Sequence, residues 1–345
     1  MTRVGLVGFG MAGALFHAPL LRAAGLEIAA ISTANPQRAA DARAAVPTAH
    51  LVPDLDELLA VPQLDLVVIA SPSGHHVDNA RATLEAGLAT VVDKPLACDA
   101  SAALSLVDLS AELDVPLTVF QNRRYDPEFR TLHRLVDSAE LGEVYRTEFR
   151  WERWRPSPPK RWREQQTAEG GGGLLLDLHT HLVDQAVQLF GPVDSVYAEL
   201  QAHTTLAEDD TFLALRHTSG AVTHVGASSV SAAPGPRMRV LASRGAYLLG
   251  SAGDEATAFP DANSPAGHHG WIVKGDVREP VAAAVSDPAD FYRQVAAALA
   301  SPDRQGGMPV DPRDAVHVLA VVDAARISAR DGRVVEILTP GQAPE

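Results

Sequence analysis

The chain has 345 residues and a formal net charge of −14 at pH 7, and a chain about twice the length of a typical domain predicts two domains. The acidic excess argues against non-specific binding to nucleic acids or anionic membranes, because it repels phosphate groups. Cys98 is the sole cysteine, which excludes an internal disulfide and a cysteine-based zinc cluster. We expect a cytoplasmic protein, because we find no signal peptide and no apolar stretch near the roughly 20 residues that span a bilayer.

The first third of the chain alternates short apolar runs with helical periods. Strands are predicted over 3–9, 26–33, 65–71, 89–95 and 116–121, and helices over 11–25, 36–45, 75–87 and 99–114. Runs that are apolar throughout are typical of parallel strands covered on both faces. The pattern predicts an α/β fold, with a doubly wound Rossmann dinucleotide-binding domain over residues 1–121.

The pattern changes after Gln121. The segment "NRRYDPEF" opens a predicted helix that runs to Gly142. Strands are then predicted over 143–154, 194–202, 211–217, 221–230 and 237–242, with Ser219 and Gly220 as a hairpin turn. Strands that follow one another without helices favour a largely antiparallel sheet.

Residues 122–345 are therefore predicted to form a second, α+β domain that binds substrate and mediates oligomerisation. Its main inner helix is expected over 174–190. The stretch 251–280 is rich in Gly, Ala, Pro and Asp and is predicted to be a loop. Two C-terminal helices are expected after it, over 287–300 and 312–330.

A glycine-rich turn follows the first predicted strand. In "GLVGFGMAG", Gly8, Gly10 and Gly13 have the G-x-G-x-x-G spacing. Glycine permits the tight turn, lets the backbone approach a pyrophosphate and packs helix on strand, while the helix start supplies N–H groups for the anion. Together with Met11 and Ala12, these glycines are predicted to bind a dinucleotide, and a purely structural glycine turn is the alternative.

The end of the second strand bears on the choice of dinucleotide. An NAD-binding chain usually has Asp or Glu there, whereas this chain has "STANPQR". Ser32 and Thr33 are neutral donors, and Arg38 in the next helix could reach a 2′-phosphate. We therefore prefer NADP over NAD, although an ordinary capped turn with a solvated Arg38 is an alternative.

Two further strand ends carry polar residues at the edge where open α/β sheets bind ligands. Lys94 precedes a proline, which keeps it out of the helical region, and burial beside a positively charged nicotinamide would favour the neutral form that transfers protons. A solvated lysine is the alternative. In "SPSGHH", Ser71, Pro72 and His76 are predicted to cap a helix and admit the nicotinamide ribose.

The segment "GGGGLLLDLHTHLVDQ" starts the predicted inner helix. On a regular helix Asp177, His181 and Asp184 share one face, while His179 is turned by about 200° from Asp177. This face presents a carboxylate and an imidazole together and favours a substrate site. We predict no metal, because a helix separates the two histidine rings and no cysteine is available. A buried His181 bonded to a backbone carbonyl is the structural alternative.

Together these segments resemble the glucose-fructose oxidoreductase and inositol dehydrogenase family, often written Gfo/Idh/MocA. The resemblance covers nearly the whole chain through "GFGMAG", "SPSGHH", "DKPL", "NRRYDPEF", "GGGGLLLDLHTHLVDQAVQLFG" and "MPVDPRDAVHVLAVVDAARISARDGRVVEI". It implies a Rossmann domain followed by a largely antiparallel α/β domain. It also implies a lysine, an aspartate and a histidine around the nicotinamide, whose counterparts are Lys94, Asp177 and His181. "NRRYD", "RWRE" and "DQAVQLFG" are most similar to the subgroup with NADP-dependent scyllo-inositol dehydrogenases.

Two positions depart from the family pattern. Asp93 stands where the family usually has Glu before its lysine, and this shorter acid should alter the contacts around the lysine more than the chemistry. His179 stands where a glycine is common, which we expect to reshape the substrate pocket.

The resemblance implies reversible oxidation of a secondary hydroxyl of a polyol, inositol or sugar, with hydride transfer to nicotinamide C4. Lys94 and His181 are expected to bracket the alcohol or ketone. Asp177, Asn122 and Arg124 are expected to bind hydroxyl groups. The predicted cofactor contacts are Gly8, Gly10, Met11, Ala12, Gly13, Ser32, Thr33, Arg38, Ser71, Pro72, His76, Asp93, Lys94, Asn122, Trp162 and Arg163.

Two other functions stay open at this point. One is a dinucleotide-dependent sensor that has lost turnover, and the other is a reductase of a C=N bond or an enone, for which Trp151, Trp154 and Trp271 leave room. Similar proteins commonly assemble through the exposed face of the antiparallel sheet. We therefore expect a homo-oligomer, either a dimer or a tetramer.

Overall fold

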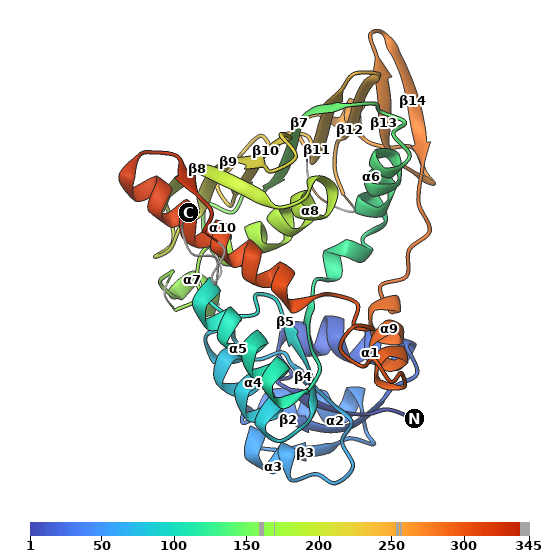
Figure 1. Cartoon of the computed structure of the whole chain (residues 1–345), viewed down its shortest axis with the longest axis vertical. Helices are drawn as coiled ribbons and strands as arrows, with labels where there is room; N and C mark the ends of the chain where they lie inside the picture. The colour runs from blue at the N-terminus through green and yellow to red at the C-terminus, as the bar shows by residue number, and fades with distance from the viewer. Residues whose placement is uncertain (159–161, 169, 253–254, 256, 339–345) are drawn as a thin grey trace. The chain divides into compact units, whose positions relative to one another are not determined.

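The chain divides into two compact units. The computed structural model describes all residues except 159–161, 169, 253–254, 256 and 339–345 (Figure 1). The first unit comprises Met1–Asn122 and Asp287–Val316, and the second comprises Arg123–Ser286 and His317–Glu345. The segment Asp287–Val316 thus belongs to the same unit as the N-terminal residues. A single domain boundary after Gln121 would have placed this segment in the second domain.

The first unit contains a sheet of six parallel strands in the order β3-β2-β1-β4-β5-β6. The strands are β1 Arg3–Val7, β2 Glu27–Ser32, β3 His50–Val52, β4 Leu66–Ile69, β5 Ala89–Asp93 and β6 Leu117–Phe120. This order confirms the predicted Rossmann fold, and only the three-residue β3 was missed. The order reverses between β1 and β4, so the residues that follow these strands lie at the edge where such sheets bind ligands.

Helices cover both faces of this sheet, which explains its continuously apolar strands. They are η1 Gly13–His17, α1 Ala18–Ala23, α2 Pro36–Ala45, α3 Leu55–Leu59, η2 Ser73–His75, α4 His76–Glu85, α5 Ala100–Leu113 and α9 Asp290–Leu299. Helices α4 and α5 lie together on one side, and α1 and α9 on the other (Figure 1). Asn35, Asp54 and Asp99 cap α2, α3 and α5 by accepting a hydrogen bond from the N–H three residues on, which fixes where these helices begin.

The second unit contains a nine-stranded sheet in the order β14-β13-β12-β11-β7-β10-β9-β8-β15. The strands are β7 Val144–Glu152, β8 Val193–Gln201, β9 Asp210–His217, β10 Val222–Ser228, β11 Met238–Ala242, β12 Gly245–Leu249, β13 His268–Lys274, β14 Val277–Ala282 and β15 Val335–Glu336. Only β7 and β10 pair in parallel, which confirms the largely antiparallel prediction. Gly220, with a φ of 86°, lies in the predicted turn between β9 and β10.

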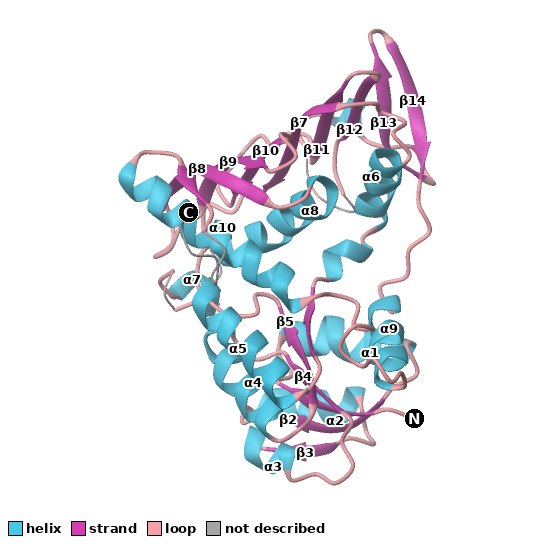
Figure 2. Cartoon of the chain, viewed as in Figure 1, coloured by secondary structure: helices cyan, strands magenta, loops and turns pink. Residues whose placement is uncertain are grey.

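One face of this sheet carries helices. The helical segments are η3 Asn122–Tyr125, α6 Pro127–Asp137, α7 Trp162–Gln165, η4 Leu175–His179, α8 Thr180–Phe190, η5 Pro260–Ala262 and α10 Pro312–Asp331, of which η3 and α10 contribute residues to both units. Figure 2 shows α6 and α8 on the same face of the sheet, and Trp151, Val225 and Leu213 are buried in the core of this unit. No helix among the described residues has the length and apolar composition needed to cross a bilayer.

Two predictions of local structure were wrong. The stretch 251–280 was predicted to be a loop, but it contains β13 and the start of β14, which form a hairpin around Gly275 and Asp276. Most side chains of β14 are exposed, so no apolar alternation marks the strand in the sequence. The helix expected to run to Gly142 ends at Asp137, because Ala139 and Gly142 have positive φ angles of 52° and 78°.

Candidate functional site

The glycine turn after β1 has a backbone that only glycine forms readily. Gly8 has a φ of 94°, and its N–H donates a 2.9 Å hydrogen bond to the carbonyl of Ser32 at the end of β2. A Cβ atom on Gly13 would overlap the Gly8 carbonyl oxygen. The turn therefore brings helix η1 close to β1, and it fits the pyrophosphate of a dinucleotide, which binds at such helix starts.

Arg38 lies next to this turn. Asn35 accepts a 3.0 Å hydrogen bond from the Arg38 N–H, which fixes Arg38 in the first turn of α2. The guanidinium carbon of Arg38 is 3.7 Å from the position of a Cβ atom on Gly10. Thr33 follows β2 and accepts a 3.4 Å hydrogen bond from the Asn35 N–H, whereas Ser32 is buried.

Asp93 and Lys94 lie at the end of β5, and a buried histidine lies beside them. The Lys94 N–H donates to Asp93 Oδ1 at 2.9 Å, and His17 Nε2 from η1 is 3.7 Å from the same oxygen. Tyr292 of α9 places its hydroxyl 2.5 Å from His17 Nδ1. A hydroxyl that donates to Nδ1 leaves the histidine proton on Nε2, facing Asp93. Sequence reasoning missed His17 and Tyr292, whose contact spans 275 positions.

Asp93 is ionised at neutral pH. Burial raises the pKa of its carboxyl, but His17, Lys94 and His76 together outweigh this and hold the pKa below its ordinary value. Burial raises the pKa of Tyr292 well above its ordinary value, so its hydroxyl keeps its proton. The shorter acid that stands in place of the family's Glu thus faces a buried histidine, which in turn contacts a buried tyrosine.

His76 connects the ends of β4 and β5. Its Nδ1 is 2.7 Å from the Pro95 carbonyl oxygen and its Nε2 is 2.9 Å from the Ser71 carbonyl oxygen. Burial lowers the pKa of His76, against the opposing effect of Asp93 and the two carbonyls. A neutral imidazole has one N–H, so His76 donates to one of these carbonyls while its other ring nitrogen faces the second. His76 thus lies between the backbone of Ser71 and the cis Lys94–Pro95 bond.

The glycine run before the inner helix makes room for a carboxylate. Gly173 has a φ of 89°, and a Cβ atom on it would overlap the Glu208 carboxylate. Glu208 accepts a 3.1 Å hydrogen bond from the Leu175 N–H, and its carbonyl accepts one of 3.1 Å from Leu174. An acidic group at a helix start is favoured by the helix dipole, and the sequence alone did not identify Glu208 in this role.

The inner helix is not regular, contrary to our expectation. It begins as the π-helix η4 and becomes α-helical only from Thr180, so the spacing that placed Asp177, His181 and Asp184 on one face does not hold. Asp177 is half-buried in the π-turn, whereas His181 and Asp184 are buried in α8. Asp184 accepts hydrogen bonds from Arg124 Nε at 2.8 Å and Nη2 at 2.5 Å. This ion pair occupies two N–H donors of Arg124, a residue that we expected to bind substrate.

His179 is a core residue. Its side chain is 0% exposed, and its Nε2 lies 2.7 Å from the Thr211 hydroxyl, which donates to the Ala227 carbonyl at 2.8 Å. Burial lowers the pKa of His179 to about 3. His179 therefore packs on the sheet instead of reshaping a substrate pocket. Within the described part of the chain, no group of His, Cys, Asp and Glu side chains is arranged to hold a metal ion.

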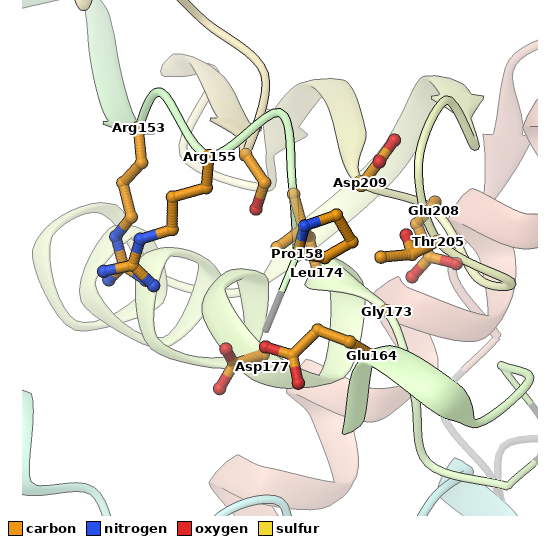
Figure 3. Close-up of a pocket in the computed structure, with 11 residues that line it drawn as sticks. Arg153, Arg155, Pro158, Glu164, Gly173, Leu174, Asp177, Thr205, Glu208 and Asp209 are labelled. Carbon is orange, nitrogen blue, oxygen red and sulfur yellow. The ribbon is translucent and has the colours of Figure 1, made fainter. Parts of the chain in front are cut away.

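Asp177 lines a pocket within the second unit (Figure 3). Arg153 and Arg155, from the segment after β7, line the same pocket. Arg153 stacks on the Trp151 ring at 5.2 Å, and this ring is 6.1 Å from that of His181. Trp151 thus connects the pocket that contains Asp177 with the buried imidazole. In the sequence, the alternation of arginine and other residues in "RWERWRP" could have indicated that these arginines share one side of an extended segment.

The remaining predicted residues are less informative. Asn122 starts η3 directly after β6, at the carboxyl edge of the parallel sheet. Met11 is exposed in the glycine turn beside Ala12. Trp162 and Arg163 begin helix α7, and their side chains lie outside the described part of the structure.

Comparisons with known proteins agree with this arrangement. The oxidoreductase family model with an NAD-binding Rossmann fold matches residues 2–121, and the Gfo/Idh/MocA C-terminal domain matches residues 129–248. Scyllo-inositol 2-dehydrogenase (NADP(+)) IolW of Bacillus subtilis is 27% identical over 96% of this chain and 95% of its own. The uncharacterized oxidoreductase YdgJ of Escherichia coli is 38% identical over 71% of this chain and 70% of its own.

Solved structures share the fold. The oxidoreductase YvaA of Bacillus subtilis has a TM-score of 0.84 at 26% identity and covers 97% of this chain and 98% of its own. The WlbA dehydrogenase of Bordetella pertussis, solved with NADH and UDP-GlcNAcA, has a TM-score of 0.78 at 24% identity and covers 98% of this chain and 99% of its own. With the glycine turn, the lysine after β5 and the antiparallel second unit, these matches show that the chain belongs to the Gfo/Idh/MocA family of NAD(P)-binding oxidoreductases.

Proposed function

We propose that this protein is a dehydrogenase that reversibly oxidises a secondary hydroxyl of a polyol, inositol or sugar, with NADP preferred over NAD. The observation that carries the proposal is Lys94, which follows β5 at the ligand-binding edge of a Rossmann sheet and is held there by an ionised Asp93. IolW, which is 27% identical, is a scyllo-inositol dehydrogenase that uses NADP. This likeness supports both the alcohol substrate and the cofactor.

The proposed roles follow from the chemistry of each side chain. When bound, the nicotinamide takes the hydride from the carbinol carbon, or returns it in the reverse direction. Lys94 donates a hydrogen bond to the reacting oxygen, and the His181 imidazole takes the hydroxyl proton as the ketone forms. Asp177 accepts a hydrogen bond from a neighbouring hydroxyl and so orients the substrate. Asn122 is a further proposed hydroxyl ligand.

The NADP preference rests on the end of β2. Thr33 is neutral, so it does not repel a 2′-phosphate as a carboxylate would. The Arg38 guanidinium lies beside Gly10 of the phosphate-binding turn, where it can pair with that phosphate. Gly8, Gly10 and Gly13 are proposed to hold the pyrophosphate.

We also propose that copies of this chain assemble through the outer face of the nine-stranded sheet. Phe212 is 36% exposed and pairs with His224, with 5.6 Å between the ring centroids. Glu148 pairs with Arg146, Arg150 and Arg239 at 3.3, 2.7 and 2.9 Å. Aromatic side chains and arginines, which are enriched at protein interfaces, thus lie on this face.

Turnover of a substrate panel tests the catalytic proposal. Inositols and aldoses are assayed with NADP and NAD by the absorbance of the reduced nicotinamide. Because general acid–base catalysis contributes roughly 10²- to 10⁴-fold, Lys94→Ala and His181→Ala should lose about that much turnover at unchanged cofactor affinity. The exposed Lys274 and the partly exposed His133 provide the control variants Lys274→Ala and His133→Gln.

Three results would contradict the proposal in different ways. If Lys94→Ala or His181→Ala keeps wild-type turnover, its assigned role is wrong. Tight NADP binding without turnover of any alcohol or ketone would favour a sensor. Turnover of imines or enones alone would favour the reductase.

A further inference from the structure

Two arginines of the second unit point into the pocket that Asp177 lines. The Arg153 N–H donates to the Ser228 carbonyl and the Arg155 N–H to the Ser229 carbonyl, both at 2.7 Å, so the backbone of both residues is held by the last residue of β10 and the residue after it. Figure 3 shows the two side chains extending from this backbone toward the side of the pocket where Asp177 lies. The backbone from which both guanidinium groups extend is thus fixed by hydrogen bonds.

Neighbouring arginines form ion pairs with acidic residues, whereas no ion pair of Arg153 or Arg155 occurs among the described residues. Arg123 pairs with Asp126 at 2.9 Å, and Arg237 pairs with Glu255 at 3.5 Å. All three of Arg123, Arg153 and Arg237 stack on the Trp151 ring. Among the residues that the structure describes, the guanidinium groups of Arg153 and Arg155 have neither a hydrogen-bond acceptor nor an ion-pair partner.

Neither of these two cations forms an ion pair with a carboxylate among the described residues that line the pocket. Burial, followed by the nearby Arg155, lowers the pKa of Arg153, and Asp177 only partly opposes this. Glu164, Glu208 and Asp209 also line the pocket, and the last two of these carboxylates are used internally. Glu208 accepts from the Leu175 N–H, and Asp209 accepts from the backbone N–H groups of residues 203 and 204 at 2.7 Å. The two guanidinium groups repel each other, and an anion that bridges both would relieve this repulsion.

We propose that Arg153 and Arg155 bind a carboxylate of the substrate, so that the substrate class is a sugar acid or polyol acid instead of a neutral polyol. This inference rests on the proposed function and specifies its substrate. The pocket has a volume of about 50 Å³, and because one water needs roughly 10–15 Å³ by this measure, a single small group fits. Arginine's planar fork matches a carboxylate, and the acidic residues of the same pocket repel a dianionic phosphate more strongly than a singly charged carboxylate.

Ligand binding to the full-length protein tests the inference without requiring turnover. Calorimetric titrations with D-glucuronate, D-glucose and D-glucose 6-phosphate are made in the presence of NADP. Since hydrogen bonds to charged groups contribute roughly 1.5–3 kcal/mol, glucuronate should bind about 10- to 100-fold more tightly than glucose. Arg153→Met and Arg155→Met should abolish this preference, and Arg153→Lys should keep part of it.

Arg278 supplies a matched control, because it stacks on the Trp271 ring at 4.9 Å but does not line the pocket. Arg278→Met should retain the full preference for glucuronate, and unchanged thermal unfolding of the exposed Arg155→Met variant shows that the fold is intact. The inference is overturned if the wild-type protein binds glucuronate no better than glucose, including by binding neither, or if both pocket variants keep the preference. Tighter binding of glucose 6-phosphate than of glucuronate overturns the assignment to a carboxylate. Arginine-dependent binding of glucuronate, with no alcohol or ketone of the panel turned over, would support this inference while refuting the proposed dehydrogenase.

Discussion

His179 illustrates how the surroundings of a single residue decide its role. The Thr211 hydroxyl has one proton, which it donates to the Ala227 carbonyl, so it must accept the proton on His179 Nε2. His179 Nδ1 is then the unprotonated nitrogen, and no described residue lies within hydrogen-bonding distance of it. Protonation of this nitrogen would place an uncompensated charge in the core, which is why its pKa falls to about 3.

This depressed pKa makes the second unit sensitive to acid. An unfolded histidine titrates near 6.5, whereas folded His179 titrates near 3, so the folded state binds fewer protons between these values. The free energy of unfolding should therefore be unaffected above about pH 7 and should fall below pH 6.5 by up to about 1.4 kcal/mol per pH unit. His179→Gln should flatten this fall, and urea unfolding followed by tryptophan fluorescence measures it, because all four tryptophans belong to the second unit.

The same substitution at a partly exposed histidine provides the control. His133 is on α6, where its Nδ1 is 2.7 Å from an oxygen of Asp137, and His133→Gln should leave the acid-induced loss of stability in place. Equal pH slopes for wild type and His179→Gln would show that His179 is not the group responsible.

At the scale of elements, we propose that the contact between α2 and the glycine turn governs cofactor choice. The Asn35 cap fixes the start of α2 and so brings Arg38 to Gly10. If this guanidinium binds the 2′-phosphate of NADP, Arg38→Ala should raise the KM for NADP by about 10-fold or more, in line with the loss of a charge-assisted hydrogen bond. The KM for NAD should stay unchanged, and steady-state kinetics with both cofactors measures the two values.

Arg43 in the last turn of the same helix offers the matched variant Arg43→Ala, which should change neither KM. Arg38→Lys should recover part of the NADP affinity, because it keeps the charge but not the planar fork. A parallel rise of both KM values in Arg38→Ala would assign Arg38 to the shape of the turn and not to phosphate recognition.

At the scale of the whole molecule, the first unit is completed by a segment from near the end of the chain. Phe291 packs on Phe120 of β6, with 5.0 Å between ring centroids, and Gln305 exchanges two hydrogen bonds with the Leu117 backbone at 2.9 and 3.2 Å. The Thr118 hydroxyl donates to the Val310 carbonyl at 2.8 Å. The Gln305 side-chain amide thus pairs with the N–H and the carbonyl of Leu117. Leu117 belongs to β6, which is an edge strand of its sheet.

The dinucleotide-binding unit should therefore depend on residues beyond 286. Phe291 is fully buried, and truncation of a buried phenylalanine typically costs about 3–5 kcal/mol, so Phe291→Ala should lower the unfolding temperature and weaken NADP binding. Differential scanning calorimetry with and without NADP measures both effects. Arg293→Ala, at an exposed position of α9, should change neither. An unaltered unfolding transition in Phe291→Ala would contradict the dependence of this unit on the returning segment.

The sequence by itself determined the features that depend on neighbouring residues. Continuous apolar runs identified β1, β2, β4, β5 and β6, and the glycine spacing identified the dinucleotide turn, because strand burial and positive φ angles leave local marks. The same reasoning selected Lys94 at the end of β5. It did not detect the π-turn of η4 or the hairpin of β13 and β14, whose causes are not local.

Tertiary structure decided what depends on partners distant in the chain. His179 became a core residue because Thr211, 32 positions away, meets its ring, and the glycine run before the inner helix serves Glu208, whose bond to Leu175 spans 33 positions. His17 gained a role only through Tyr292. A buried polar group takes its role from the groups that satisfy its hydrogen bonds and charge, and chain folding alone brings those groups together.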